Sequence, residues 1–88
     1  MTEIQIEIIN SAGLHARAAS KLAELCASFG CEIQVGHEKM VDGKSILSLM
    51  MLAAVKGTML TITANGPDEE RAIEAISSLI NNRFDEGE

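Results

Sequence analysis

The 88-residue chain contains no tryptophan and no tyrosine, and its only aromatic side chains are Phe29 and Phe84. A core built from this sequence must be aliphatic, and the aromatic platforms on which nucleic-acid bases stack are missing. Basic residues are scarce too, with 7 Lys and Arg against 13 Asp and Glu and a formal net charge of −6. Because phosphate backbones are bound by clustered basic side chains, the composition argues against nucleic acid as a partner.

Cysteine occurs only as Cys26 and Cys31, too few for the disulfide framework of a small secreted domain. Their spacing fits no familiar metal-binding pattern, and we expect neither a metal nor a cofactor. The first residues lack the basic and apolar regions of a signal peptide, and no uncharged run approaches the ~20 residues of a membrane span. We therefore expect a cytoplasmic protein with reduced thiols and no membrane insertion.

The hydrophobic period changes several times along the chain and predicts seven elements. Ile4, Ile6 and Ile8 alternate with polar residues, as in a half-buried strand, and from about Ala16 the period becomes helical until Gly30. The elements predicted after this helix are strands at 31–35 and 39–41, a short helix from 46 to about 54, a strand at 59–64, and a final helix that starts near 67 and includes Phe84.

This order, β-α-β-β-α-β-α, contains no internal repeat or linker, and 88 residues are enough for only one core. We expect a single domain spanning residues 1–88. Four short strands that are polar on one side need cover on the other, which the helices supply. The prediction is an α+β fold, a two-layer open-faced sandwich in which helices cover a four-stranded antiparallel sheet. Residues 85–88 are predicted to form a frayed acidic tail.

The stretch SAGLHAR at residues 11–17 is the most informative one. Its glycine loop places His15 at the start of a helix. The backbone amides of Ala16 and Arg17 there have no hydrogen-bond acceptor within the helix and carry partial positive charge. A phosphate there would meet these amides and the Arg17 guanidinium, beside an imidazole nitrogen that can act as a nucleophile. The pattern suggests a histidine that accepts a phosphoryl group. A histidine at this spacing is more commonly an inert loop residue, and that alternative stays open. The sequence also places no acidic residue where it would orient His15.

Ser45 directly precedes an apolar helical run, so its ordinary role is that of an N-cap. A phosphate on this serine would be compatible with that position and would add about −1.5 to −2 charge to the neighbouring surface. The segment Asp42–Ser45, DGKS, lacks the upstream glycine of a P-loop.

The segment GLHAR at residues 13–17 resembles the histidine-site signature of the HPr family, the phosphocarriers of the bacterial phosphotransferase system. The segment KSI at residues 44–46, with the apolar run 47–54 after it, resembles the serine-site signature of the same family at a matching separation. The likeness extends from the first strand to the last helix. One departure is Ala18, where the family usually has a proline that fixes φ in the first helical turn.

The resemblance implies that His15 is phosphorylated on Nδ1 by phosphoenolpyruvate-charged enzyme I and hands the group to enzyme IIA domains, with Arg17 stabilising it. It also implies that Ser45 is a regulatory serine, phosphorylated by an HPr serine kinase/phosphorylase in lineages that have one. Leu47 and Met50 match the apolar patch through which family members dock on their partners. Such a protein is a covalent carrier rather than a stand-alone enzyme, and we expect a monomer that serves sugar transport.

Three other interpretations stay open. The carrier of the nitrogen-related phosphotransferase system shares the histidine motif but acts in regulation and is not coupled to sugar uptake; the Lys44–Ile46 match favours a carrier under kinase control. An acyl carrier protein is also small, acidic and built around a serine before a helix, but its fold is all helical, whereas this chain has alternating strands. The third is a passive binding module in which His15 is inert.

Overall fold

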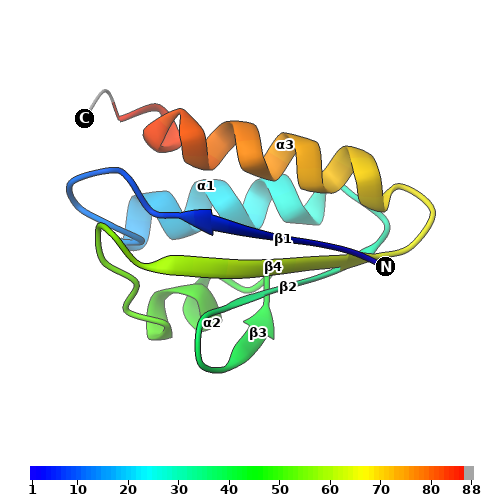
Figure 1. Cartoon of the computed structure of the whole chain (residues 1–88), viewed down its shortest axis with the longest axis horizontal. Helices are drawn as coiled ribbons and strands as arrows, with labels where there is room; N and C mark the ends of the chain where they lie inside the picture. The colour runs from blue at the N-terminus through cyan, green and yellow to red at the C-terminus, as the bar shows by residue number, and fades with distance from the viewer. Residues whose placement is uncertain (87–88) are drawn as a thin grey trace.

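The computed structural model describes residues 1–86 and has the predicted order of elements (Figure 1). Within these residues, no helix combines the length and the apolar character needed to cross a membrane. The elements in chain order are β1 (Thr2–Glu7), α1 (Ala16–Ala27), β2 (Glu32–Gly36), β3 (Met40–Asp42), α2 (Ile46–Met51), β4 (Met59–Asn65), α3 (Glu69–Asn81) and the short helical turn η1 (Arg83–Asp85).

The four strands form one antiparallel sheet in the order β1-β4-β2-β3. The central residue Ile62 of β4 pairs with Ile4 of β1 on one side and with Val35 of β2 on the other. Residues directly opposite each other in a sheet project from the same face, so these side chains share the covered face. The predicted antiparallel sheet is confirmed.

Helices α1 and α3 lie side by side over one face of the sheet, and α2 lies beside β3 (Figure 1). The other face is open, and the side chains that β1 directs there, Glu3, Gln5 and Glu7, are exposed. The predicted open-faced sandwich is therefore confirmed. Its core is aliphatic apart from Phe84, Cys26 and Cys31. Its largest fully buried apolar side chains are Ile8, Leu22, Ile33, Val35, Leu49, Leu60, Ile62, Ile76, Ile80 and Phe84.

The first helix is shorter than predicted. α1 ends at Ala27 rather than at Gly30, because the amide and the hydroxyl of Ser28 both donate to the carbonyl of Leu25 and close the last turn. The amide of Gly30 donates instead to a carboxylate oxygen of Asp68, 2.8 Å away, which ties this loop to the start of α3. The hydrogen bonds of Ser28 therefore end the helix, and the contact with Asp68 holds the loop that follows it.

The second helix is also shorter than predicted. α2 ends at Met51 rather than near Ala54. The backbone of Ala53 has a φ of 52°, in the left-handed region, which a right-handed helix cannot include.

The final helix ends at Asn81, and Phe84 is not part of it. Arg83, Phe84 and Asp85 all have φ between 53° and 63°, and this left-handed turn directs Phe84 back into the core, where it is fully buried. The prediction of a frayed tail from residue 85 is wrong for Asp85 and Glu86, whose side chains contact Lys21 and His15. Residues 87–88 of that predicted tail lie outside the described part of the chain.

Candidate functional site

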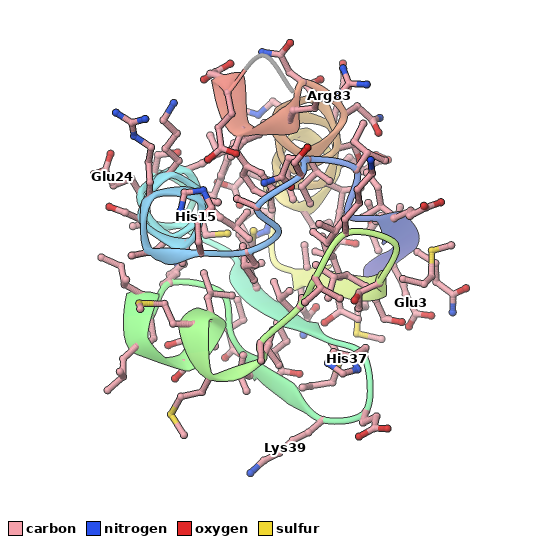
Figure 2. The ribbon with its side chains drawn as sticks, turned by 90° about the vertical axis from the view of Figure 1, so that its left-hand side faces the viewer. Glu3, His15, Glu24, His37, Lys39 and Arg83 are labelled. Atoms are coloured by element: carbon pink, nitrogen blue, oxygen red, sulfur yellow. The ribbon has the colours of Figure 1, made fainter. Side chains whose placement is uncertain are left out.

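The loop that carries His15 is fixed against the connection between α2 and β4. Its backbone turns at Gly13, which has a φ of 68° and packs so closely that a Cβ would lie 2.6 Å from the carbonyl oxygen of Ala54. The amide of Leu14 donates to that same oxygen at 2.8 Å, and the Leu14 side chain is buried. His15 then projects from the start of α1, at the end of the molecule that faces the viewer in Figure 2.

Both ring nitrogens of His15 are engaged. Nδ1 accepts a hydrogen bond from the backbone amide of Arg17 at 3.3 Å, which makes His15 the N-cap of α1. Nε2 contacts a carboxylate oxygen of Glu86. The side chain of His15 is still 35% exposed, so a molecule arriving from solvent can reach the ring.

The carboxylate of Glu86 is fixed by a second residue, Asn10, which is a fully buried polar side chain. The Nδ2 of Asn10 donates to the carbonyl of Gly13 at 2.8 Å and to Oε1 of Glu86 at 3.0 Å. Burial raises the pKa of Glu86, but hydrogen bonds from Asn10 and His15, with the nearby charge of Arg17, outweigh burial and leave the pKa below its usual value.

The protonation of Glu86 decides the tautomer of His15. An ionised carboxylate can only accept hydrogen bonds, so Nε2 must be the donor in the contact with Glu86. Nδ1 in turn accepts from the amide of Arg17 and carries no proton. The imidazole is therefore held with its proton on Nε2 and its free lone pair on Nδ1, at the N-terminal end of a helix.

The predicted anion-binding groups lie beside this lone pair. Ala16 and Arg17 are exposed in the first turn of α1, and the Arg17 guanidinium is close enough to lower the pKa of Glu86. The helix starts where predicted although Ala18 stands at the position of the family proline, and Ala18 itself is fully buried. The structure thus brings together His15, Ala16 and Arg17.

Ser45 begins α2 as predicted, since its Oγ accepts a hydrogen bond from the amide of Ser48 at 3.2 Å. Leu47 and Met50 are 69% and 40% exposed. The side chain of Met51, which was not predicted as part of the docking patch, is 76% exposed and lies four residues after Leu47, hence on the same helix face. That spacing could have identified it.

We call the exposed apolar residues on and just after this helix the α2 surface; its members are Ile46, Leu47, Met50, Met51 and Val55. The close contact between Gly13 and the Ala54–Val55 backbone joins this surface to the loop that carries His15. The α2 surface and the loop that carries His15 are therefore adjacent.

Two residues of the site, Asn10 and Glu86, were not identified from the sequence. In the sequence Asn10 has the features of an ordinary turn residue. Glu86 belongs to an acidic C-terminal segment and is 71 positions away from His15. No local pattern signals either contact, because both depend on the path of the C-terminal segment.

The remaining candidates take no part in this site. His37 is exposed on the connection between β2 and β3, well apart from His15 (Figure 2), with Nε2 3.3 Å from the carbonyl of Leu52. Cys26 and Cys31 are free, buried thiols, and burial raises the pKa of Cys26 to about 12. Among residues 1–86, no group of three or more His, Cys, Asp or Glu is arranged to hold a metal ion.

Comparison with known proteins gives consistent matches over most or all of the chain. A family model described as "PTS HPr component phosphorylation site" matches residues 2–82. The phosphocarrier protein HPr of Pseudomonas aeruginosa is 51% identical over 90 residues and 100% of both chains, and the phosphocarrier protein NPr of Shewanella violacea is 42% identical over 96% of this chain and 93% of its own. The crystal structure of HPr-C-His from Thermoanaerobacter tengcongensis matches with a TM-score of 0.94 at 40% identity, over 98% of each chain.

Proposed function

The chain belongs to the HPr family of phosphocarrier proteins, and from that membership we propose that residues 1–88 are one cytoplasmic carrier domain that receives a phosphoryl group on His15 from phosphorylated enzyme I and passes it to an enzyme IIA domain. The observation that carries this proposal is the orientation of the imidazole. Nε2 faces the carboxylate of Glu86, and Nδ1 accepts from the Arg17 amide at a helix N-terminus, where an anion is favoured.

The transfer exchanges one bond to phosphorus for another. The Nδ1 lone pair of His15 forms the new bond while the bond to the donor's imidazole breaks, and that electron pair leaves with the donor. The guanidinium of Arg17 and the first amides of α1 neutralise the oxygens of the moving group. The Arg17 amide, which donates to Nδ1 before transfer, then donates to a phosphoryl oxygen.

The α2 surface is the proposed docking site for enzyme I and enzyme IIA, with Leu47 and Met50 as the contacts that the family resemblance assigns. It is small, as suits a carrier that must bind weakly and leave quickly. Ser45 lies at the start of α2, one residue before Ile46, so a phosphate placed there by a serine kinase would add negative charge beside the docking site. The contacts that bind partners and the serine that regulates them would then lie on one short helix, α2.

The direct test is incubation with enzyme I and labelled phosphoenolpyruvate. We expect an acid-labile, base-stable label on the wild-type protein and none on His15→Ala. The matched control is His37→Ala, which removes the only other histidine of the chain and should be labelled like the wild type. Undiminished labelling of His15→Ala would contradict the proposal.

The role of Arg17 is tested with the same reagents. Arg17→Ala should still accept some label but transfer it to enzyme IIA about tenfold more slowly or worse, because charge-assisted hydrogen bonds to the phosphoryl group are lost. Arg71→Ala removes an exposed arginine from α3 and is the control for the change in net charge. Equal transfer rates for the two variants would exclude the assigned role.

A second candidate is a carrier of the nitrogen-related system, since relatives named NPr also match the chain. The chemistry at His15 would be the same and only the acceptor would differ. The relatives named HPr reach higher identity, 51% against 42%, which favours the first candidate. Competition between an enzyme IIA of a sugar permease and an enzyme IIA of the nitrogen-related system for the labelled group distinguishes them.

A further inference from the structure

Glu86 reaches His15 on a folded segment. The left-handed turn at 83–85 buries Phe84 completely, and the carbonyl oxygen of Phe84 accepts a hydrogen bond from Nζ of Lys21 at 3.0 Å. The same ammonium group lies 3.7 Å from a carboxylate oxygen of Asp85. Because α1 carries both Lys21 and the N-cap His15, the helix that presents the imidazole also holds the residues that precede Glu86.

The carboxylate itself is oriented at both oxygens. Oε1 accepts from Nδ2 of Asn10 at 3.0 Å and Oε2 accepts from Nε2 of His15. Asn10 is in turn held by the carbonyl of Gly13, in the loop that delivers the histidine. The side chain of Glu86 is only 13% exposed, so solvent competes little for these bonds.

We propose that Glu86 is a positioning residue for phosphoryl transfer, an inference that rests on the proposed function of His15. By accepting the Nε2 proton in a hydrogen bond, Glu86 keeps the ring in the tautomer whose Nδ1 is the nucleophile. When the bond between Nδ1 and phosphorus forms, the ring becomes positively charged, and the carboxylate stabilises that charge without taking the proton. The bond between phosphorus and the donor breaks, its electron pair leaves with the donor, and the proton stays on Nε2.

The groups around the ring disfavour the other neutral tautomer of His15. An imidazole with its proton on Nδ1 could not accept from the Arg17 amide and would offer its lone pair on Nε2, against Glu86. Two lone-pair-bearing atoms would then face each other in a partly buried site, which is unfavourable. The carboxylate and the amide therefore select the same tautomer from opposite sides of the ring.

The test compares Glu86→Gln, which keeps the shape and removes the charge, with Glu74→Gln, which removes one charge from an exposed position on α3. Nitrogen-15 NMR of the imidazole reports the tautomer directly and needs no partner protein. We expect wild type and Glu74→Gln to hold the proton on Nε2, and Glu86→Gln to show a clear population with the proton on Nδ1. The single-turnover rate of labelling by enzyme I should fall about tenfold in Glu86→Gln only.

A third variant, Glu86→Asp, keeps the charge on a side chain one methylene shorter, and we expect it to recover part of the labelling rate. Wild-type tautomer and labelling rate in Glu86→Gln would overturn the proposal, even if its thermal stability were lower, since that result indicates a merely structural contact. Failure of the wild-type protein to be labelled would be a different result, because it overturns the proposed function itself.

Discussion

The Nζ of Lys21 lies 3.0 Å from the carbonyl oxygen of Phe84, and this hydrogen bond joins α1 to the left-handed turn that follows α3. The two partners are 63 residues apart in sequence. This bond holds the C-terminal segment against the end of the molecule where His15 lies, and Glu86 therefore lies beside the imidazole. The stability of this turn and the geometry of the proposed phosphorylation site are therefore coupled.

Phe84→Ala should be strongly destabilising, by about 3–5 kcal/mol in the free energy of unfolding, since the deleted ring is fully buried. Urea denaturation followed by circular dichroism measures this loss. Phe29→Ala removes the other aromatic ring of the chain, which is only partly buried, and should cost less. Equal losses in the two variants would show that Phe84 does not anchor the turn.

Gly13→Ala should weaken both the fold and the labelling of His15. Its φ of 68° is strained for alanine, and the new Cβ would lie 2.6 Å from the carbonyl oxygen of Ala54 and 2.9 Å from Cα of Val55. Gly57→Ala is the matched control, because its φ of 93° is also strained but its Cβ would meet nothing within 4 Å. The control should lose only the ~1–3 kcal/mol of stability that the strained backbone conformation costs an alanine. A smaller loss in Gly13→Ala than in Gly57→Ala would be inconsistent with the packed loop.

Ser45→Ala and Ser45→Asp should separate the capping role from the docking role. Alanine removes the hydrogen bond to the Ser48 amide and should cost roughly 1 kcal/mol of stability, whereas aspartate can still accept that bond. Aspartate also places a negative charge beside the α2 surface, so labelling by enzyme I should slow while stability is kept. Ser78→Asp, at an exposed position on α3, should leave the labelling rate unchanged. If both aspartate variants were labelled equally fast, charge at Ser45 would not affect docking.

Glu69 should make the fold sensitive to acid. The Thr2 hydroxyl, the Gly66 amide and the N-terminal ammonium group all donate to its carboxylate and lower its pKa from 4.5 to about 2. A carboxyl whose pKa is lower in the folded state stabilises the fold above pH 4.5 and loses that contribution as the pH falls towards 2. The melting temperatures of wild type and Glu69→Gln should therefore converge over this range.

The matched control for this titration is Glu74→Gln, which removes an exposed carboxylate from the same helix and should follow the pH dependence of the wild type. Differential scanning calorimetry at intervals from pH 6 to pH 2 measures all three proteins. A gap between wild type and Glu69→Gln that stays constant with pH would contradict the assignment.

Features that depend on near neighbours were predictable from the sequence. Ile4 and Ile6 alternate with exposed residues because successive side chains of a strand point to opposite faces. The start of α1 at Ala16 and the cap at Ser45 depend on hydrogen bonds that span a few residues. Helix ends were less predictable, since α2 stops before Ala53, whose left-handed φ of 52° no hydrophobic period signals.

By itself, then, the sequence determined the element types and the position of His15 at the start of a helix, because periodicity and capping are local properties of the chain. The order of the elements and the polar face of each strand predicted the open-faced sandwich. Only the tertiary structure decided that Glu86 and Asn10 complete the site. The reason is geometric. Burying Phe84 requires a left-handed turn that no hydrophobic period encodes, and that turn sets where the following carboxylate lies.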